Sequence, residues 1–246
     1  MENKTVKKIK FWHILLAVIV LMTGMFIITD TRPVVFISGK AYFGLSTKVQ
    51  FRNVYFSEED FNSLKHMRNV KQAVFIVDKL DLTILKRMNR LKDLTIGFRV
   101  DYYIEDWTTL SNCKKLEIFV GLNLKMTDLS TFKDMSNLKI LYIESMGAAN
   151  LKTSIINDIS DVKSLTKLER FSVSGKNIID ISSLNSLVEL KELSLFGTTC
   201  NDYSVLLELP NLKSLDIDKG VLTENEIKTL EEKGISVYEY EYSENG

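Results

Sequence analysis

Residues 157–175 read NDISDVKSLTKLERFSVSG, and residues 178–197 read IIDISSLNSLVELKELSLFG. Each stretch ends in a motif of the form L-x-x-L-x-L, Leu168-Phe171-Val173 in the first and Leu190-Leu193-Leu195 in the second. An Asp-Ile pair begins ten residues before each motif. Since the same residue types return at the same spacing, the two stretches predict one structural unit that is repeated along the chain.

The motif recurs over most of the sequence, with copies that start at Val70, Leu91, Leu116, Leu138, Leu168, Leu190 and Leu212. The steps between these starts are 21, 25, 22, 30, 22 and 22 residues, so the base period is 22, with insertions near residues 100–103 and 146–153. Five copies also share an aspartate at one position, namely Asp106, Asp128, Asp158, Asp180 and Asp202. An Asp at this position can accept backbone N–H bonds, so we expect each one to start a short helical turn.

The pattern predicts an α/β fold, a leucine-rich repeat solenoid of about seven coils. Each coil supplies a short strand, a turn and a helical or 3₁₀ return, and stacked coils share a core that one coil cannot bury alone. The two quoted stretches resemble the 22-residue repeats of the internalin-type family of bacterial surface proteins. The resemblance covers about residues 70–218, and it implies a right-handed horseshoe. Together with the Lys- and Asn-rich composition, it also indicates a Gram-positive bacterium.

The sequence departs from that family at one turn position. The family usually has Asn at position 9 of the repeat, where this chain has Arg99, Leu124, Met146, Lys176, Thr198 and Gly220. Stacked Asn amides bond the turning backbone in the family. We therefore expect the backbone polar groups at these turns to find other partners in this chain.

Both ends of the repeat array, which we place at residues 70–222, carry cap signals. Residues 29–69 are expected to form a linker and an N-terminal cap, with a strand in TKVQFRNVYF and a helix that begins after Ser57. Residues 223–246 are expected to form a C-terminal cap of one helix and one strand. Its helix starts with the capping box Thr223-x-x-Glu226 and ends at Gly234, and ISVYEYEY follows as the strand.

The N-terminus carries a different signal. Residues 11–28, FWHILLAVIVLMTGMFII, contain no Asp, Glu, Lys or Arg, and a helix of this length spans about 27 Å, close to the thickness of a bilayer core. Four lysines precede it in residues 1–10, which predicts a cytoplasmic stub, an uncleaved transmembrane signal anchor and extracytoplasmic repeats in the cell membrane. A cleaved signal peptide and a buried core helix are the alternatives.

Composition argues against several classes of function. The chain has 32 basic and 32 acidic residues, whereas a nucleic-acid binder needs a basic surface. No phosphate loop, metal-binding spacing or nucleophile motif is present in the sequence, so we expect no catalytic residue, no metal and no cofactor. His66 is expected on the surface of the cap. Cys113 and Cys200 occupy apolar repeat positions four coils apart, which predicts two free, buried thiols.

Alternating strand residues should face the concave surface of the solenoid. The coils that start at Leu116 and Leu138 place apolar residues there side by side, namely Ile118, Val120, Leu122, Ile140 and Tyr142. Later coils add polar residues and one aromatic residue, namely Glu144, Arg170, Glu192, Phe196 and Asp216. A contiguous exposed apolar patch marks a contact site, although residues 146–153 or 31–50 of the same chain are an alternative cover.

The resulting hypothesis is a membrane-anchored, extracytoplasmic leucine-rich repeat module. It binds a protein or peptide through its concave face and contacts the lipid bilayer through residues 11–28, with no role for nucleic acid. The alternative hypothesis is a membrane-tethered structural or regulatory subunit that binds another membrane protein in cis.

Overall fold

The computed structural model describes residues 34–99, 102, 104–144 and 156–241. The predicted cytoplasmic stub and the apolar segment 11–28 lie outside these residues, as does the insertion 146–153. Within the described ranges, no helix is both long and apolar enough to cross a membrane. The transmembrane anchor therefore stays a prediction from the sequence.

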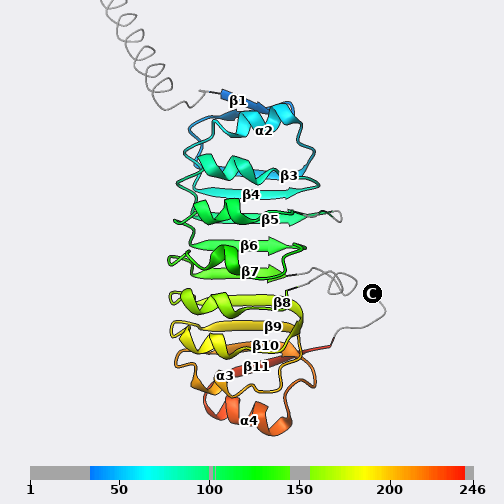
Figure 1. Ribbon diagram of the computed structural model, residues 1–246, viewed down its shortest axis with the longest axis vertical. Helices are drawn as coiled ribbons and strands as arrows, with labels where there is room; N and C mark the ends of the chain where they lie inside the picture. Colours follow the sequence, from blue (N-terminus) through cyan, green and yellow to red (C-terminus); the bar gives the residue numbers. More distant parts are fainter. Residues whose placement is uncertain (1–33, 100–101, 103, 145–155, 242–246) are drawn as a thin grey trace, which may run out of the picture.

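The described residues form one parallel sheet of nine strands whose spatial order is the order in the chain (Figure 1). The strands are β3 (Lys48–Val54), β4 (Gln72–Val77), β5 (Asp93–Phe98), β6 (Ile118–Leu122), β7 (Ile140–Glu144), β8 (Arg170–Ile178), β9 (Glu192–Thr198), β10 (Ser214–Asp218) and β11 (Ser236–Tyr240). Strands β4 to β10 come from the seven copies of the motif. A parallel sheet in which each strand pairs with the next one in the chain is the solenoid that the repeat predicts.

The pairing register follows the repeat. Leu94 pairs with Phe119, Phe119 with Leu141, and Leu141 with Phe171, and each of these is the fourth residue of its motif. Equivalent positions therefore lie above one another through the stack. The apolar side chains at one position of the repeat therefore form a continuous row through the core.

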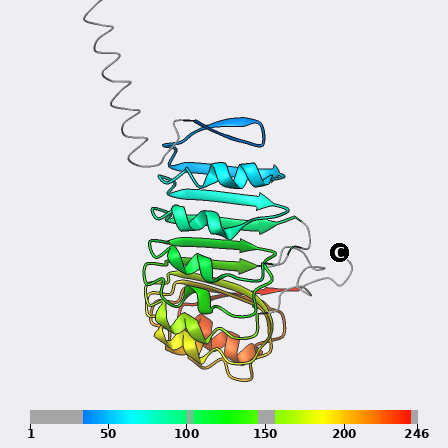
Figure 2. The same ribbon diagram turned by 45° about the horizontal axis from the view of Figure 1, so that its top comes forward.

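Short helical turns return the chain from one strand to the next and lie over one face of the sheet (Figure 2). They are the 3₁₀ turns η1 (Leu82–Arg87), η2 (Thr108–Asn112), η3 (Ser130–Phe132), η5 (Ser160–Ser164) and η6 (Ser182–Ser186), and the short helix α3 (Val205–Glu208). The predicted role of the repeated aspartate is confirmed, because each one accepts the N–H of the residue two positions later at 2.7–2.9 Å. Asp81 likewise accepts the N–H of Thr83 at 2.9 Å, so the first coil has the same hydrogen bond.

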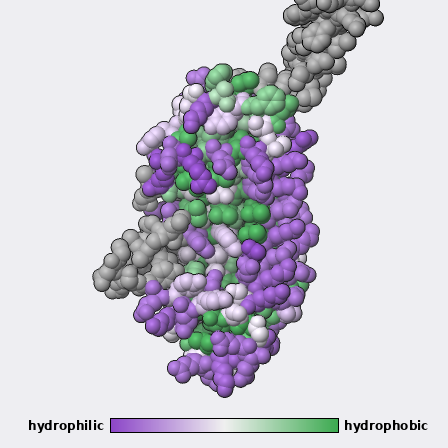
Figure 3. All heavy atoms as spheres, turned by 180° about the vertical axis from the view of Figure 1, so that it is seen from behind, coloured by the Kyte–Doolittle hydropathy of each residue, from purple (hydrophilic) through white to green (hydrophobic). Residues whose placement is uncertain are grey.

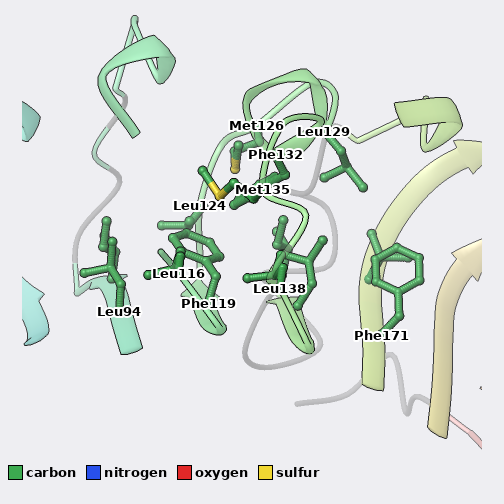
Figure 4. Close-up of a cluster of buried hydrophobic side chains, with 14 of the residues drawn as sticks. Leu94, Leu116, Phe119, Leu124, Met126, Leu129, Phe132, Met135, Leu138 and Phe171 are labelled. Carbon is green, nitrogen blue, oxygen red and sulfur yellow. The ribbon is translucent and has the colours of Figure 1, made fainter. Parts of the chain in front are cut away.

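The hydrophobic core lies between the sheet and these turns. In Figure 4, Leu116, Phe119 and Leu138 come from the strand side, and Met126 and Phe132 come from the turn side. Phe119 and Phe132 are fully buried, with ring centroids 4.8 Å apart. Since burial of a large apolar side chain contributes about 2 kcal/mol, this shared core is what holds the coils together.

The N-terminal cap contains more structure than the sequence predicts. The expected strand and helix are present as β3 and α2 (Glu58–Leu64), and Ser57 forms a capping box with Asp60. However, residues 34–43 are an antiparallel hairpin of β1 (Val34–Ile37) and β2 (Lys40–Phe43) rather than a linker. The hairpin is hard to recognise in the sequence because each of its strands has only four residues. Its turn is Ser38-Gly39, in which both residues have a positive φ.

The C-terminal cap agrees with the prediction. Helix α4 (Glu224–Glu232) begins with the Thr223–Glu226 capping box, and Gly234 follows it at a φ of +84°. Strand β11 then pairs in parallel with β10. Strands β3 and β11 thus extend the repeat sheet into both caps.

The turns that lack the family's Asn are satisfied in several ways. The N–H of Arg99 donates to the Val77 carbonyl, and its guanidinium makes two bonds, of 2.8 and 2.7 Å, to Asp78 of the preceding coil. Farther along, the N–H of Gly220 donates to the Glu239 carboxylate at 2.9 Å. Partners from the neighbouring coil therefore replace an amide ladder at these turns.

One prediction about the cysteines is wrong. Both thiols are free, and Cys113 is buried, but Cys200 is only half-buried. Its Sγ donates to the Asp202 carbonyl at 3.0 Å, and the side chain packs against the edge of the core.

Candidate functional site

The sheet has one face under the turns and one that they leave uncovered, which we call the open face. Burial alternates along each strand, as in β6, where Phe119 is buried while Ile118, Val120 and Leu122 are half-exposed. The open face is the one predicted to be concave. Figure 3 shows hydrophobic residues along its middle, flanked by hydrophilic ones.

The predicted apolar residues lie on neighbouring strands. Ile118 pairs with Ile140, Val120 with Tyr142, and Leu122 with Glu144. Cross-strand neighbours on one face of a sheet bring their Cβ atoms to about 5 Å, so these side chains form one contiguous surface. The structure therefore brings together the first five residues of the predicted site.

The apolar surface extends farther than the predicted set. Strand β5 places Gly97 between Ile76 and Leu122. A Cβ on Gly97 would lie 2.9 Å from Ile76 Cδ1 and 3.2 Å from Leu122 Cβ, so only glycine lets these two side chains approach each other. We define the apolar patch as Val74, Ile76, Ile118, Val120, Leu122, Ile140 and Tyr142. The signal in the sequence is the glycine at an open-face position.

The polar residues of the predicted site border this patch. Arg170 lies beside Ile140 and forms an ion pair with Glu192, with Nε and Oε2 3.3 Å apart. Glu144 accepts a hydrogen bond from the hydroxyl of Ser172, a buried residue that the sequence did not single out. Most of the border is thus held by bonds between adjacent strands.

Electrostatics at the border act on Tyr142. Burial raises the pKa of its hydroxyl, and the negative charge of Glu192 adds to this effect, while hydrogen bonding and charge from Arg170 oppose it. The hydroxyl is therefore neutral at physiological pH. It presents an oriented polar group at the edge of an apolar surface, which is where tyrosine is enriched in protein interfaces.

Two predicted residues lie apart from the patch. Phe196 on β9 packs edge-on against Tyr240 of β11, with ring centroids 5.7 Å apart. Asp216 on β10 accepts from the Ser194 hydroxyl at 2.8 Å. At about 4.8 Å per strand, β10 lies about 14 Å from β7, the last strand of the apolar patch, so Asp216 belongs to a separate, acidic end of the open face.

One proposed cover of the patch is placed elsewhere. The described part of residues 31–50 forms the hairpin and the start of β3 at the N-terminal end of the stack, away from β6 and β7 (Figure 1). The other proposed cover, residues 146–153, lies outside the described residues. The part of the chain that the structure describes leaves the apolar patch half-exposed.

The described residues contain no group of three or more His, Cys, Asp or Glu side chains arranged to hold a metal ion. His66 is half-buried just after α2, on the cap where the sequence places it.

No protein-family model matches the sequence, and no curated protein sequence is significantly similar to it. Several solved structures are similar in fold. The functional domain of InlJ from Listeria monocytogenes is 14% identical, with a TM-score of 0.54, over 76% of this chain and 37% of that one. Internalin C2 from the same species is 20% identical over 73% of this chain and 85% of that one, with a TM-score of 0.49.

A third structure, the L. monocytogenes internalin InlF, is 17% identical over 89% of this chain and 81% of that one, with a TM-score of 0.43. The likeness to the InlJ domain shows that this chain has an internalin-type leucine-rich repeat fold. At these identities, it is the fold that is shared. The chain spans little more than a third of the InlJ domain.

Proposed function

We propose that this chain is a membrane-anchored recognition module that binds a protein or peptide through the open face of its repeats. The observation that carries the proposal is the apolar patch, seven neighbouring side chains from β4, β6 and β7. An apolar patch of this kind on a protein surface is typical of a binding site.

The chemistry of the face indicates what kind of ligand fits. The patch takes apolar side chains, and the Tyr142 hydroxyl and the Arg170–Glu192 pair beside it take polar or charged groups. Because a nine-stranded sheet holds these groups, little ordering entropy is lost on binding. A ligand segment in which an apolar stretch is followed by hydrogen-bonding side chains fits this face, because the apolar patch and then the polar groups follow one another along the solenoid.

Membrane anchoring rests on the sequence. The 18 residues Phe11–Ile28 are without charge, and the lysines before them favour a cytoplasmic N-terminus. The repeats then face the outside of the cell. A fixed, outward-facing binding surface is suited to contact with another protein.

The variant Val120→Lys tests the binding surface, because it places a charge at the centre of the patch. Random peptides displayed on phage are selected for binding to the full chain in lipid nanodiscs. We expect enriched peptides to be rich in apolar residues and to lose binding to Val120→Lys by at least tenfold. The matched control Ser136→Lys adds the same charge to an exposed position of the same coil, on the turn side.

Thermal unfolding of both variants separates binding from folding. Unchanged stability with lost binding supports a ligand site. Strong destabilisation by Val120→Lys alone indicates that the chain covers its own patch, which contradicts the proposal. Enriched peptides that bind Val120→Lys as well as the wild type contradict it too.

Two further measurements test the membrane part. Protease added to intact cells should digest the repeats, and protection of the repeats would overturn the proposed topology. Exchange of residues 1–28 for an unrelated anchor should leave peptide binding intact. Loss of a membrane partner on this exchange would favour the alternative, a subunit that binds in cis.

A further inference from the structure

The outer face of the N-terminal hairpin is apolar. In the β1–β2 register Val34 pairs with Phe43 and Phe36 with Ala41, so these four residues share one face. Val34 is 45% exposed, Phe36 65% and Phe43 52%. Three large apolar side chains on a ten-residue hairpin are an unusual surface for a cap, whose function is to shield the end of a solenoid from water.

This outer face is presented by a well-anchored element. The inner face of the hairpin buries Val35 and Ile37, and Tyr42 packs on Phe51 of β3 at 5.1 Å between ring centroids. The turn is tied to α2, because the Ser38 N–H donates to the Asp60 carboxylate at 2.6 Å. The exposed phenylalanines are therefore held outward by the fold. Hydrophobic residues gather at this end of the molecule in Figure 3.

The position of the hairpin in the chain identifies what it faces. Five residues separate Val34 from the end of the apolar run at Ile28. Six steps along the chain reach at most about 21 Å, so an anchored chain holds the hairpin within that distance of the bilayer. A short tether of this kind gives the membrane a high effective concentration at the cap.

Charge agrees with this placement. Residues 34–57 contain Lys40, Lys48 and Arg52 and no Asp or Glu. All three basic residues are exposed, and the next acidic residues are Glu58 and Glu59, in the first turn of α2. Basic residues near an anionic bilayer are attracted to it, so the charge at this end of the solenoid favours contact with anionic lipid.

We propose that the outer face of the hairpin, Val34, Phe36, Ala41 and Phe43, inserts into the interface of the lipid bilayer. This inference rests on the proposed membrane anchor and adds a second contact. Together the two contacts fix the orientation of the solenoid. The nine strands then stack away from the membrane over about 38 Å, with the apolar patch facing sideways above the lipid headgroups.

Environment-sensitive fluorescence at single cysteines tests the contact. The full chain is reconstituted into vesicles of phosphatidylcholine and phosphatidylglycerol, in a Cys200→Ser background that removes the half-exposed thiol. An NBD label is placed at Phe36→Cys and, in a second variant, at Phe43→Cys. The control is Ile179→Cys, because Ile179 is 66% exposed, like Phe36, and lies about 24 Å farther along the stack.

We expect labels at positions 36 and 43 to emit at shorter wavelength, to lose quenching by iodide and to gain quenching by nitroxide-labelled lipid. The label at position 179 should show none of these changes. Carbonate extraction of the same vesicles reports separately whether the chain is membrane-integrated. An integrated chain whose labels at 36 and 43 behave like the label at 179 would overturn the hairpin contact and leave the anchor standing. A chain released by carbonate would overturn both.

Discussion

The Asp60 carboxylate accepts a hydrogen bond from the main-chain N–H of Ser38 at 2.6 Å and another from the N–H of Ser57 at 2.9 Å. One side chain therefore caps helix α2 and fastens the β1–β2 hairpin, 22 residues earlier, to the same helix. Burial opposes ionisation of Asp60, but the hydrogen bonds from Ser57 and Ser38 outweigh it and lower the pKa of this carboxyl.

Replacement of this carboxylate should loosen the cap. Asp60→Ala leaves the Ser38 and Ser57 N–H groups without their acceptor, and bonds to a charged group contribute about 1.5–3 kcal/mol each. We expect the free energy of unfolding in urea to fall by about 2–3 kcal/mol. Glu59→Ala, at an exposed neighbouring position of the same helix turn, should change it by less than about 0.5 kcal/mol. Equal effects of the two substitutions would contradict the role of Asp60.

Acid should destabilise the repeats through their aspartates. Hydrogen bonds from the residue two positions later lower the pKa of Asp106, Asp128, Asp180 and Asp202. A carboxyl whose pKa is lower in the folded state stabilises the fold above its unfolded pKa, about 3.9, and this stability is lost as pH falls through the folded pKa. We expect urea stability to decline below about pH 4.

The matched variant replaces these four aspartates with asparagine, which still accepts the N–H but does not titrate. Its stability near neutral pH should stay close to that of the wild type, while its decline in acid should be smaller. An unchanged acid profile would show that other groups cause the decline.

Two glycines with positive φ should respond differently to alanine. A Cβ on Gly197, at a φ of +67°, would lie 2.0 Å from the Gly175 carbonyl oxygen, whereas one on Gly220, at +77°, meets nothing within 4 Å. Gly220→Ala should cost only the backbone strain, about 1 kcal/mol. Gly197→Ala should cost at least about 2 kcal/mol more, because β8 and β9 must separate. Comparable melting temperatures for the two variants would refute this close approach.

The two thiols should differ in reactivity. Burial raises the pKa of Cys113 to about 11, so it is neither ionised nor accessible at neutral pH. Cys200 is half-buried beside the Asp202 carbonyl. A disulfide reagent such as DTNB should titrate one thiol in the native protein and two after unfolding, and Cys200→Ser should abolish the native reaction. Two rapidly reacting native thiols would mean that the coil around Cys113 opens readily.

The sequence predicted the repeated parts of this fold well, for a physical reason. A solenoid coil contacts mainly its neighbours, so each apolar slot and each turn-forming aspartate has the same environment in every copy. Asp106 and Asp180 therefore follow one rule, and each accepts the N–H of the residue two positions later. The capping boxes at Ser57 and Thr223 were also readable, because they are local to one helix turn.

Features that occur once were less predictable. The hairpin of residues 34–43 has no repeat to reveal it, and its contact with Asp60 joins segments 22 residues apart. Cys200 occupies an apolar position of the repeat, yet only the structure shows that it is half-buried. The side chains of Ile76 and Leu122 approach each other across Gly97, and this arrangement involves residues of three successive coils.

The leucine-rich repeat, its period and the residues that alternate between core and open face can all be read from the amino-acid sequence. These follow from local spacing, because a strand turns successive side chains to opposite faces and a repeat stacks equal positions. The extent of the apolar patch and the charges that border it become visible only in the folded protein. The same is true of the second apolar face, on the hairpin, which points away from the core. Those properties depend on which side chains of different coils and caps meet in space, and spacing along the chain does not encode such distances.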